Sequence, residues 1–495
     1  MQEVPKVTAK SVWLKTPLTI FYPDLCDVVR LFWGDVSISP DEGETVITQE
    51  CAEGGAHFFD LWSCGEETYA YHKEITTQSP LEFKRLRKRA AKMGLYGLMK
   101  QMTGVTPPWG ALTGIRPTRL LYEGMEHGLP RDLAMRRLTA EYDVSPERAA
   151  LLRDISLMQE GLREMPENAF DLYIGIPFCT TRCAYCSFSS GELGKGKLVK
   201  PYVDALLHEI AVCGEMMRQA GRKVRAAYMG GGTPTSIPCA DLERILAAAQ
   251  EQFPGAVEWT VEAGRPDTID PEKLSMLRRR GVGRISVNPQ TFCDETLRRV
   301  GRAHTGEDTV RAYRQAREAG FEDINMDLIA GLPGEDLDIF RKTLEKVVEL
   351  NPDSVTVHSL AIKRSSRLHE QLHVNEGGHT RVNEKQAGEM IDLARQTLTR
   401  GGWQPYYLYR QKYMAGNLEN VGYAKPGKAC LYNIGNMEET ASVLALGAGA
   451  ITKWIYDREL RIERAPNVKN IEEYIARVDE MCQRKRALIL EDPEA

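Results

Sequence analysis

Six short apolar runs alternate with amphipathic helical stretches between residues 171 and 361. The runs read DLYIGIP, RAAYMGGG, EWTVEAG, RISVNPQ, DINMDLIAGL and SVTVHSLA, and the stretches between them include YVDALLHEIAVCGEMMRQA and LERILAAAQEQF. Strands that alternate with helices build a parallel sheet, because each helix returns the chain to the edge where the previous strand began. The pattern predicts an α/β fold, either a doubly wound open sheet or a partial (βα)6 barrel, with site residues at the carboxyl ends of the strands.

Two segments of different character flank this core. Residues 1–165 contain alternating apolar and polar pieces such as SVWLKTPLTIFY and HFFDLW, which predict a small antiparallel unit, followed by helical periodicity from Pro80 onward. Residues 368–495 form a mixed segment with a tyrosine-rich stretch and a final helix. We therefore expect an N-terminal α+β domain over 1–165, a core over 166–367 and a C-terminal substrate-side domain over 368–495.

Charge and hydropathy exclude several classes of partner. The 64 Lys and Arg residues nearly balance the 69 Asp and Glu residues, so no global field attracts the chain to nucleic acid or to an acidic membrane. No window approaches the about 20 apolar residues of a membrane-spanning helix, and the N-terminal segment lacks the apolar region of a secretory signal. We expect a cytoplasmic monomer that neither binds nucleic acid nor inserts into a membrane. The basic run KRLRKR at 84–89 predicts a solvated helix face or a patch for RNA or an acidic partner.

Three of the 11 cysteines, Cys179, Cys183 and Cys186, stand close together directly after the first strand of the core. In a reducing compartment such a cluster indicates metal or redox chemistry rather than disulfides. Three thiolates can each bind one iron of a cubane cluster and leave the fourth iron open for a non-protein ligand. Structural zinc and simple packing are the alternatives, although zinc prefers four ligands in paired groups. The other cysteines are scattered singly, which predicts small buried side chains.

The C-x-x-x-C-x-x-C spacing, followed one strand later by MGGGTPT at 229–235, resembles the radical S-adenosylmethionine (SAM) superfamily. Within it, YIGIPFC, GGGTPT, TVEAG, NPQTFCDETLRRVGRAH and NMDLIAGLPGE resemble the oxygen-independent coproporphyrinogen III oxidase (dehydrogenase) family and its haem-chaperone relatives, in the long form with an N-terminal extension. The resemblance covers roughly Leu172 to Trp454. It implies a partial (βα)6 barrel, a [4Fe-4S] cluster held by the three cysteines, and SAM bound to the open iron.

Particular residues acquire roles from this resemblance. A glycine run lets the backbone approach a ligand closely, and a carboxylate at a strand end can accept the ribose hydroxyls of a nucleoside, which is the role implied for Glu262. A helix-cap neighbour or a surface ion pair is the alternative for this glutamate. Tyr173, Gly231 and Ile451 would touch the same SAM. A second SAM would be held by Tyr185, Gly232, Thr233, Gln290, Arg302, Asp327 and Ala361, of which Arg302 and Asp327 are otherwise members of ion pairs in the barrel.

The resemblance implies a radical SAM oxidoreductase that decarboxylates coproporphyrinogen III to protoporphyrinogen IX by means of a deoxyadenosyl radical. No general acid or base is needed at the reacting carbon, so we name no catalytic residue beyond the cluster and SAM. The expected partners are a tetrapyrrole substrate and an electron donor such as flavodoxin or ferredoxin. Guanidinium and ammonium groups suit the propionates of the substrate. The cations proposed for this purpose are Arg410, Lys412, Arg364 and Lys363.

Several positions depart from the family pattern and keep two other functions open, a haem-binding chaperone and a radical SAM enzyme that modifies haem. Phe188 stands where the dehydrogenase has a further cysteine, as in the chaperone relatives, and Gly175 stands where the family commonly has a histidine. Ile451 and Tyr432 stand where the chaperone relatives have histidines. The first departure favours the chaperone, and the last two count against it.

Overall fold

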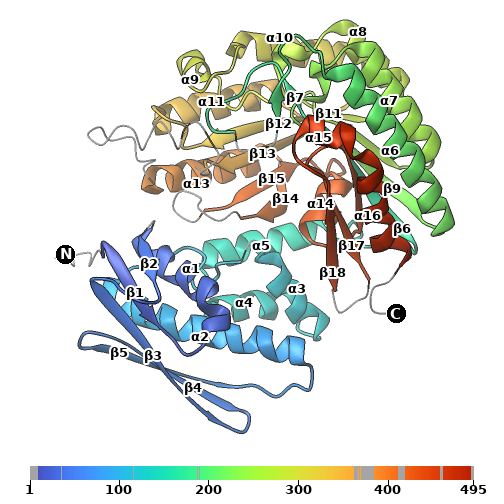
Figure 1. Ribbon diagram of the computed structural model, residues 1–495. Helices are drawn as coiled ribbons and strands as arrows, with labels where there is room; N and C mark the ends of the chain where they lie inside the picture. Colours follow the sequence, from blue (N-terminus) through green and yellow to red (C-terminus); the bar gives the residue numbers. More distant parts are fainter. Residues whose placement is uncertain are drawn as a thin grey trace. The chain divides into compact units, whose positions relative to one another are not determined.

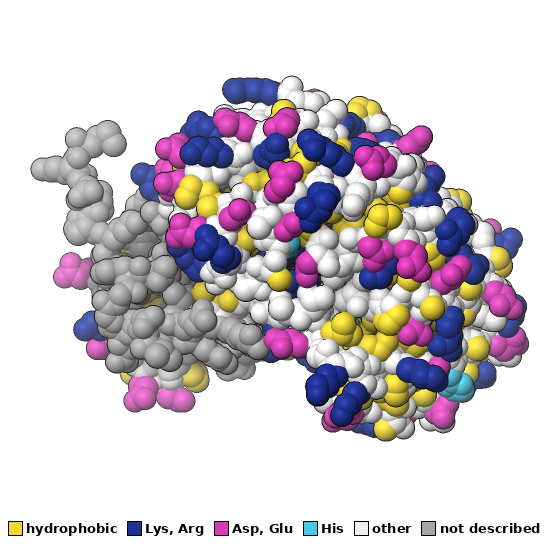
Figure 2. Space-filling view, turned by 90° about the horizontal axis from the view of Figure 1, so that it is seen from above, with side chains coloured by type: hydrophobic (Ala, Val, Ile, Leu, Met, Phe, Trp, Pro, Cys, Tyr) yellow, Lys and Arg dark blue, Asp and Glu magenta, His cyan; other side chains and the backbone are white. Residues whose placement is uncertain are grey.

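The computed structural model in Figure 1 describes residues 9–491, apart from 35, 115, 187, 189, 362–365, 367, 369–383, 411–417 and 457–460. The chain divides into two compact units, Met1–Arg153 and Asp154–Ala495. The finer division at 165/166 and 367/368 stays a prediction. On the face shown in Figure 2, positive and negative side chains are interspersed, as the small net charge of −5 leads one to expect.

The first unit contains a five-stranded sheet in the order β2-β1-β3-β4-β5. Its strands are β1 Ser11–Lys15, β2 Ser37–Ser39, β3 Thr45–Gly54, β4 His57–Cys64 and β5 Glu67–Glu74. The antiparallel prediction is confirmed for β3 to β5 and is wrong for β1, which pairs in parallel with β2 and β3. The reason is a helix that the sequence analysis missed, α1 (Tyr22–Trp33), whose buried Leu25, Val28 and Val29 follow helical spacing.

Helices complete the first unit. They are α2 Pro80–Thr103, α3 Thr118–Glu126, α4 Arg131–Tyr142 and α5 Pro146–Met158, of which α5 runs on into the second unit. The prediction of a fully solvated basic face on α2 is wrong for Arg87, which is 3% exposed and donates two hydrogen bonds to the buried carboxylate of Asp60, over 2.7 and 2.8 Å. A guanidinium in this bidentate pair neutralises a charge inside the unit and is not available to a partner.

Six parallel strands form the centre of the second unit, in the order in which the chain makes them. They are β6 Ala169–Ile176, β9 Lys223–Gly231, β10 Glu258–Val261, β11 Arg284–Ser286, β12 Asp323–Ala330 and β13 Ser354–Ser359. The helices between them are α6 Val199–Gln219, α7 Cys239–Gln252, α8 Pro271–Arg279, α9 Asp294–Arg299, α10 Gly306–Glu318 and α11 Leu337–Leu350. Figure 1 shows this helical layer along the outer side of the sheet. The predicted α/β core is confirmed.

The C-terminal segment adds strands to both edges of this sheet and brings it to 11 strands. On the β13 side stand β15 Asn420–Ala424 and then β14 Gln404–Tyr409, and on the β6 side stand β16 Val443–Leu446, β17 Ile451–Ile455 and β18 Ile462–Pro466. The helices of this segment are α13 Glu384–Arg400, α14 Leu431–Met437, α15 Ile471–Ala476 and α16 Val478–Leu490. Two short strands, β7 Phe178–Cys179 and β8 Gly191–Glu192, pair separately after β6.

Register brings the carboxyl ends of the central strands to one edge. Ile176 of β6 lies opposite Gly231 of β9, and Met229 of β9 lies opposite Val261 of β10. Polar residues that follow these strands are therefore neighbours in space although they are far apart in the sequence. Among the described residues, no helix has the length and apolar character needed to cross a membrane.

Candidate functional site

The loop with the three clustered cysteines leaves the carboxyl end of the sheet directly after β6 and β7. It is fixed by backbone contacts, since the Ala184 N–H donates to Val300 O over 2.9 Å and the Cys186 N–H donates to Cys183 O over 3.1 Å. Arg265 donates to Thr181 O over 2.9 Å and has a nitrogen 3.9 Å from Cys183 Sγ. The Arg265 guanidinium therefore contacts both the backbone and one thiol of the loop.

Asp267 holds the same loop from a second direction. Its carboxylate accepts hydrogen bonds from Thr180 Oγ1 over 2.9 Å and from Arg265 Nε over 3.1 Å, and His304 Nδ1 lies 3.8 Å away. Although partial burial alone would raise it, the pKa of Asp267 is held well below its usual range by His304, Arg265 and Thr180. The carboxylate of Asp267 thereby connects the loop to the residues that follow β10.

All three thiols are free, so the loop is not closed by a disulfide. Cys183 is buried while Cys179 and Cys186 are half-buried, and burial together with the neighbouring Cys183 and Cys179 raises the pKa of Cys186. Among the described residues, no three His, Cys, Asp or Glu side chains converge on a point where they could hold a single metal ion. A cubane cluster makes a different demand, because each thiolate binds its own iron. The donor set fits a three-thiolate cluster better than a mononuclear zinc site.

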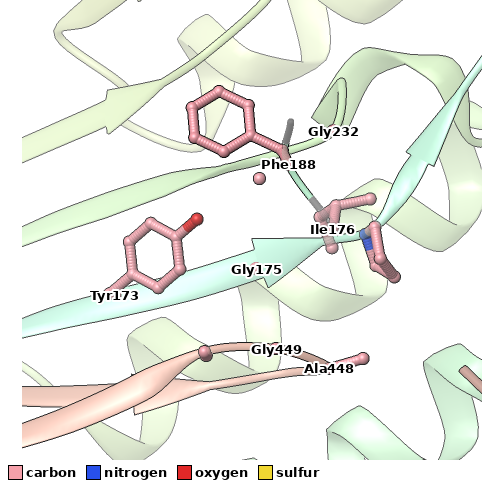
Figure 3. Close-up of a pocket in the computed structure, with 10 residues that line it drawn as sticks. Tyr173, Gly175, Ile176, Phe188, Gly232, Ala448 and Gly449 are labelled. Atoms are coloured by element: carbon pink, nitrogen blue, oxygen red, sulfur yellow. The ribbon is translucent and has the colours of Figure 1, made fainter. Parts of the chain in front are cut away.

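A cavity of about 180 Å³ adjoins this loop at the ends of β6 and β9 (Figure 3). The rings of Tyr173 and Phe188 face the same space, and Ala448 and Gly449 enter from the β16 side of β6. The lining consists of Tyr173, Gly175, Ile176, Pro177, Phe188, Gly231, Gly232, Ala448, Gly449 and Ala450. Small residues dominate this list, which leaves room for a ligand close to the backbone.

Two glycines are required by the close approach of neighbouring backbone. Gly231 has φ +108°, and a Cβ there would lie 3.1 Å from Ile176 N and O. A Cβ on Gly232 would lie 2.6 Å from Phe178 O. The amide of Gly232 already donates to Ile176 O over 2.8 Å, so this glycine contributes space rather than a free N–H. The glycine run fits a ligand cradle in which any side chain would collide with β6 or β7.

Glu262, which follows β10, is oriented by an aromatic neighbour. The hydroxyl of Tyr228 donates to Glu262 Oε1 over 2.5 Å, and the Tyr228 ring stacks on Tyr432 with centroids 4.7 Å apart. Loss of hydration in the site raises the pKa of Glu262 to about 7, with Asp327 adding to the rise and Tyr228 opposing it. A carboxylate held in this way can accept hydroxyl groups at the edge of the sheet.

Two polar residues assigned to a second SAM, Asp327 within β12 and Arg302 after α9, both contact Asn288, which follows β11. Asp327 accepts from Asn288 Nδ2 over 2.8 Å and from Asn325 Nδ2 over 2.7 Å, and His358 Nε2 lies 3.7 Å away. Arg302 donates to Tyr185 OH over 3.1 Å and to two backbone carbonyls. Asp327 thus accepts its hydrogen bonds mainly from amides, and among the described residues its ion-pair candidate is the His358 imidazole rather than an arginine or a lysine.

Gln290 and Arg302 retain buried polar atoms that no described residue satisfies. Gln290 has φ +65°, an uncommon conformation for a residue with a side chain, and its Oε1 is buried without a hydrogen-bond partner in the described structure. Arg302 Nε is also buried without a hydrogen-bond partner in the described structure. Such groups are costly unless a ligand or water satisfies them, so both residues fit a polar ligand at this position.

The remaining predicted site residues lie at the same edge without lining the cavity. Ile451 is 50% exposed at the start of β17, beside the lining residues Ala448 to Ala450. Ala361 is half-buried after β13, and Thr233 Oγ1 lies 3.6 Å from Cys179 Sγ. Arg410 is buried after β14. Lys363, Arg364 and Lys412 lie outside the described residues.

Sequence reasoning missed part of the lining. Phe188 entered only as a departure from the family, yet it is a wall residue that is 68% exposed. The run ALGAGA at 445–450, directly before the predicted site residue Ile451, consists mainly of small residues that could have indicated a cavity wall. Of the scattered cysteines, Cys26, Cys213, Cys430 and Cys482 are buried as predicted, whereas Cys51, Cys64, Cys239 and Cys293 are half-buried.

Comparison with known proteins identifies the family. Residues 173–347 match the model of the Radical SAM superfamily. The chain is 39% identical over 398 residues to the oxygen-independent coproporphyrinogen-III oxidase-like protein HemZ of Bacillus subtilis, which covers 78% of each chain. It is 31% identical over 284 residues to the heme chaperone HemW of Escherichia coli, over 56% of this chain and 68% of that protein.

A solved structure supports the same assignment. Coproporphyrinogen III oxidase (HemN) from Escherichia coli, described as a radical SAM enzyme, superposes with a TM-score of 0.53 at 26% identity, over 66% of this chain and 73% of that one. This chain therefore belongs to the radical SAM superfamily and, within it, to the family of oxygen-independent coproporphyrinogen III oxidases and their relatives.

Proposed function

We propose that this protein is an oxidoreductase that converts coproporphyrinogen III to protoporphyrinogen IX with a [4Fe-4S] cluster and SAM. The observation that carries the proposal is the glycine-walled cavity beside a loop with three free cysteines. The likeness to HemZ, over 78% of each chain, supports the tetrapyrrole substrate. An electron donor such as flavodoxin or ferredoxin is part of the proposal, because the chemistry consumes an electron at the cluster.

The proposal assigns the binding of each cofactor to particular residues of this chain. Cys179, Cys183 and Cys186 would hold the cluster, and the cavity next to them would take SAM. When bound, the two groups together supply a 5′-deoxyadenosyl radical that abstracts a hydrogen atom. Glu262 would orient the ribose through its second carboxylate oxygen, because the first accepts the Tyr228 hydroxyl.

Substrate binding needs cations for the propionates and a site from which water is excluded. Arg410 is the described member of the proposed cation set, and it is 3% exposed at the end of β14. Phe188 and Tyr173 supply aromatic surface to the lining of the cavity. A radical generated beside these rings would be separated from bulk water on that side.

A haem-chaperone function is the second candidate, and one observation favours it. Phe188, not a cysteine, lines the cavity, and the chain is 31% identical to HemW of Escherichia coli. Against it, Tyr432 is 6% exposed and stacked on Tyr228 at 4.7 Å, where it presents no imidazole to a haem iron. A haem-modifying radical enzyme would share the cavity and differ in its product.

The deciding experiment is an anaerobic product assay. The reconstituted protein is incubated with coproporphyrinogen III, SAM and a reductant, and the products are identified by mass spectrometry. We expect 5′-deoxyadenosine together with the successive loss of two carbon dioxide molecules from the tetrapyrrole. Deoxyadenosine without a vinyl product would overturn the substrate, and stoichiometric haem binding without SAM cleavage would favour the chaperone. Haem converted to a ring-opened or methylated product would indicate the modifying enzyme.

A further inference from the structure

One wall of the cavity is built by the C-terminal segment and not by the barrel strands. The chain from Gly447 to Ala450 follows β16, and three of these four residues, Ala448, Gly449 and Ala450, line the cavity. Gly447 has φ +97°, and a Cβ there would lie 2.5 Å from Gly175 O and 2.6 Å from Tyr202 OH. The wall is therefore pressed against β6, and its position determines the width of the cavity.

The polar groups of this wall are held by partners that lie outside the cavity. The Gly447 N–H donates to Glu209 Oε2 over 2.8 Å, and Gly447 O accepts from Asn467 Nδ2 over 2.8 Å. The Ala448 N–H donates to Tyr202 OH over 3.2 Å, and the same hydroxyl donates to Gly175 O over 2.6 Å. The Gly449 N–H donates to Val468 O over 2.8 Å. Each bond of the wall leads to α6 or to the chain before α15, and Tyr202 of α6 is bonded in turn to β6.

Glu209 of α6 is the centre of this arrangement. Its side chain is fully buried, and its two oxygens accept four hydrogen bonds from four different residues. Besides Gly447, the donors are Asn467 Nδ2 over 2.9 Å, Tyr474 OH over 2.6 Å and Lys485 Nζ over 2.7 Å. Lys485 of α16 is also fully buried and donates to Asn467 Oδ1 over 2.5 Å. A buried charge pair that is fully hydrogen-bonded fixes one geometry, because any shift leaves a charge unpaired.

We propose that Glu209 is a positioning residue for the cofactor cavity, which with Lys485, Asn467 and Tyr474 sets the Gly447–Ala450 wall. This inference rests on the proposed function, because it takes SAM to be the ligand that lies against the wall. None of these four side chains lines the cavity, so they act on the ligand only through the wall. It follows that α15 and α16 are a structural part of the cofactor site although they follow every barrel strand in the sequence.

The test uses Tyr474→Phe, which removes one donor to Glu209 and keeps the ring that packs on Tyr202 at 5.2 Å. Leu488→Ala is the matched control, because Leu488 is a buried residue of the same helix as Lys485 and is not one of the four donors to Glu209. Both variants lose stability, but only Tyr474→Phe disturbs the wall. Two measurements separate them: hydrogen–deuterium exchange of the peptide that contains residues 444–452, and the Kd for SAM of the anaerobically reconstituted protein.

We expect Tyr474→Phe to speed exchange at the wall and to raise the Kd for SAM about fivefold to tenfold, with unchanged iron content. Leu488→Ala should change neither the exchange rate at the wall nor the Kd for SAM by more than about twofold. The pair Glu209→Gln and Lys485→Met, combined in one protein, should recover part of the affinity that Lys485→Met alone loses, because the combination leaves no buried charge unpaired. Unchanged exchange at 444–452 in Tyr474→Phe overturns the positioning role. Faster exchange in that variant with no SAM binding by the unmodified protein overturns the proposed function instead.

Discussion

The hydroxyl of Tyr228 on β9 donates a 2.5 Å hydrogen bond to Glu262 Oε1 at the end of β10, and this contact joins the aromatic stack of the sheet to the edge where the site lies. The pKa of Glu262 is raised to about 7 by loss of hydration, and the Tyr228 hydroxyl opposes that rise. Because the role proposed for Glu262 is to accept the ribose hydroxyls as a carboxylate, SAM affinity should fall as the pH drops through about 7.

The first prediction concerns this pH dependence. Below its pKa Glu262 is protonated, so the Kd for SAM should rise up to about tenfold for each pH unit below the midpoint. Tyr228→Phe removes the bond that lowers the pKa, so the midpoint should move to higher pH. Both effects are measured by equilibrium binding of SAM over about two pH units around the midpoint, roughly from pH 6 to pH 8. Glu262→Gln serves as the control and should show a weak but flat profile; a sloping one would assign the titration to another group.

The second prediction concerns the ligands of the cluster. Cys179→Ala, Cys183→Ala and Cys186→Ala should each abolish the brown colour and lower the bound iron after anaerobic reconstitution, because each thiolate binds a different iron. Cys239→Ala removes a half-buried thiol at the start of α7 and should keep the iron of the unmodified protein. Full iron content in any of the three loop variants would rule out this ligand set.

The third prediction concerns the close approach at Gly232. Gly232→Ala places a Cβ 2.6 Å from Phe178 O, so β7 or the cavity must shift. We expect the free energy of unfolding to fall by about 1–3 kcal/mol, which is typical of overpacking. We expect SAM affinity to fall by a larger fraction than the stability does. Gly283→Ala is the control, since no atom lies within 4 Å of its Cβ and its φ is not positive. Chemical denaturation and SAM titration of both variants decide whether the space is needed.

The fourth prediction concerns Phe188. Its ring lines the cavity while 68% of the residue is exposed, so it covers the cavity without being part of the core. Phe188→Ala should leave stability within about 0.5 kcal/mol and should speed the bleaching of the cluster by dioxygen severalfold. Phe188→Leu keeps apolar cover and should bleach more slowly than the alanine variant. Equal bleaching rates in all three proteins would show that the ring does not shield the site.

The fifth prediction concerns the first unit. Arg87 and Asp60 form a buried bidentate pair at 2.7 and 2.8 Å, so Arg87→Met leaves a carboxylate without its countercharge. Such a change costs about 3–5 kcal/mol of stability. Lys88→Met, one residue along α2, breaks a solvent-exposed pair with Asp24 and should cost less than about 1 kcal/mol. Urea unfolding of both variants provides the comparison.

The sequence predicted the six central strands because each is a short, mainly apolar run between helical stretches, the pattern of a parallel sheet covered by helices. The five strands of the C-terminal segment were missed for a physical reason. β15 pairs with β13 and β16 pairs with β6, which precede them by many residues, and no local periodicity encodes such a distant partner. The other three strands, β14, β17 and β18, join the sheet only through β15 and β16. In the first unit the alternation of SVWLKTPLTIFY continues past Lys15, where β1 ends, although the chain then passes through a 3-10 turn at Thr19–Phe21 into α1.

Part of the candidate site could likewise be predicted from the sequence, and part could not. The cysteine loop, the glycine run and Glu262 stand at strand ends that could be located from the sequence, and the structure brings them to one edge of the sheet. The wall at Ala448 to Ala450 could not be located, because it reaches the cavity only through the pairing of β16 with β6. Contacts made by buried polar groups, such as Glu209 with Lys485, depend on segments more than 200 residues apart and leave no motif in the sequence.

The pairing of β16 with β6 has a consequence for synthesis and folding. β6 leads into the cysteine loop, and it is an interior strand only because β16 covers the side away from β9. Until residues 443–446 have left the ribosome, β6 is the open edge of a growing parallel sheet, with unpaired N–H and C=O groups along an apolar strand. A nascent or truncated chain that ends before Val443 would thus be prone to edge-to-edge association at the strand that leads into its cysteine loop.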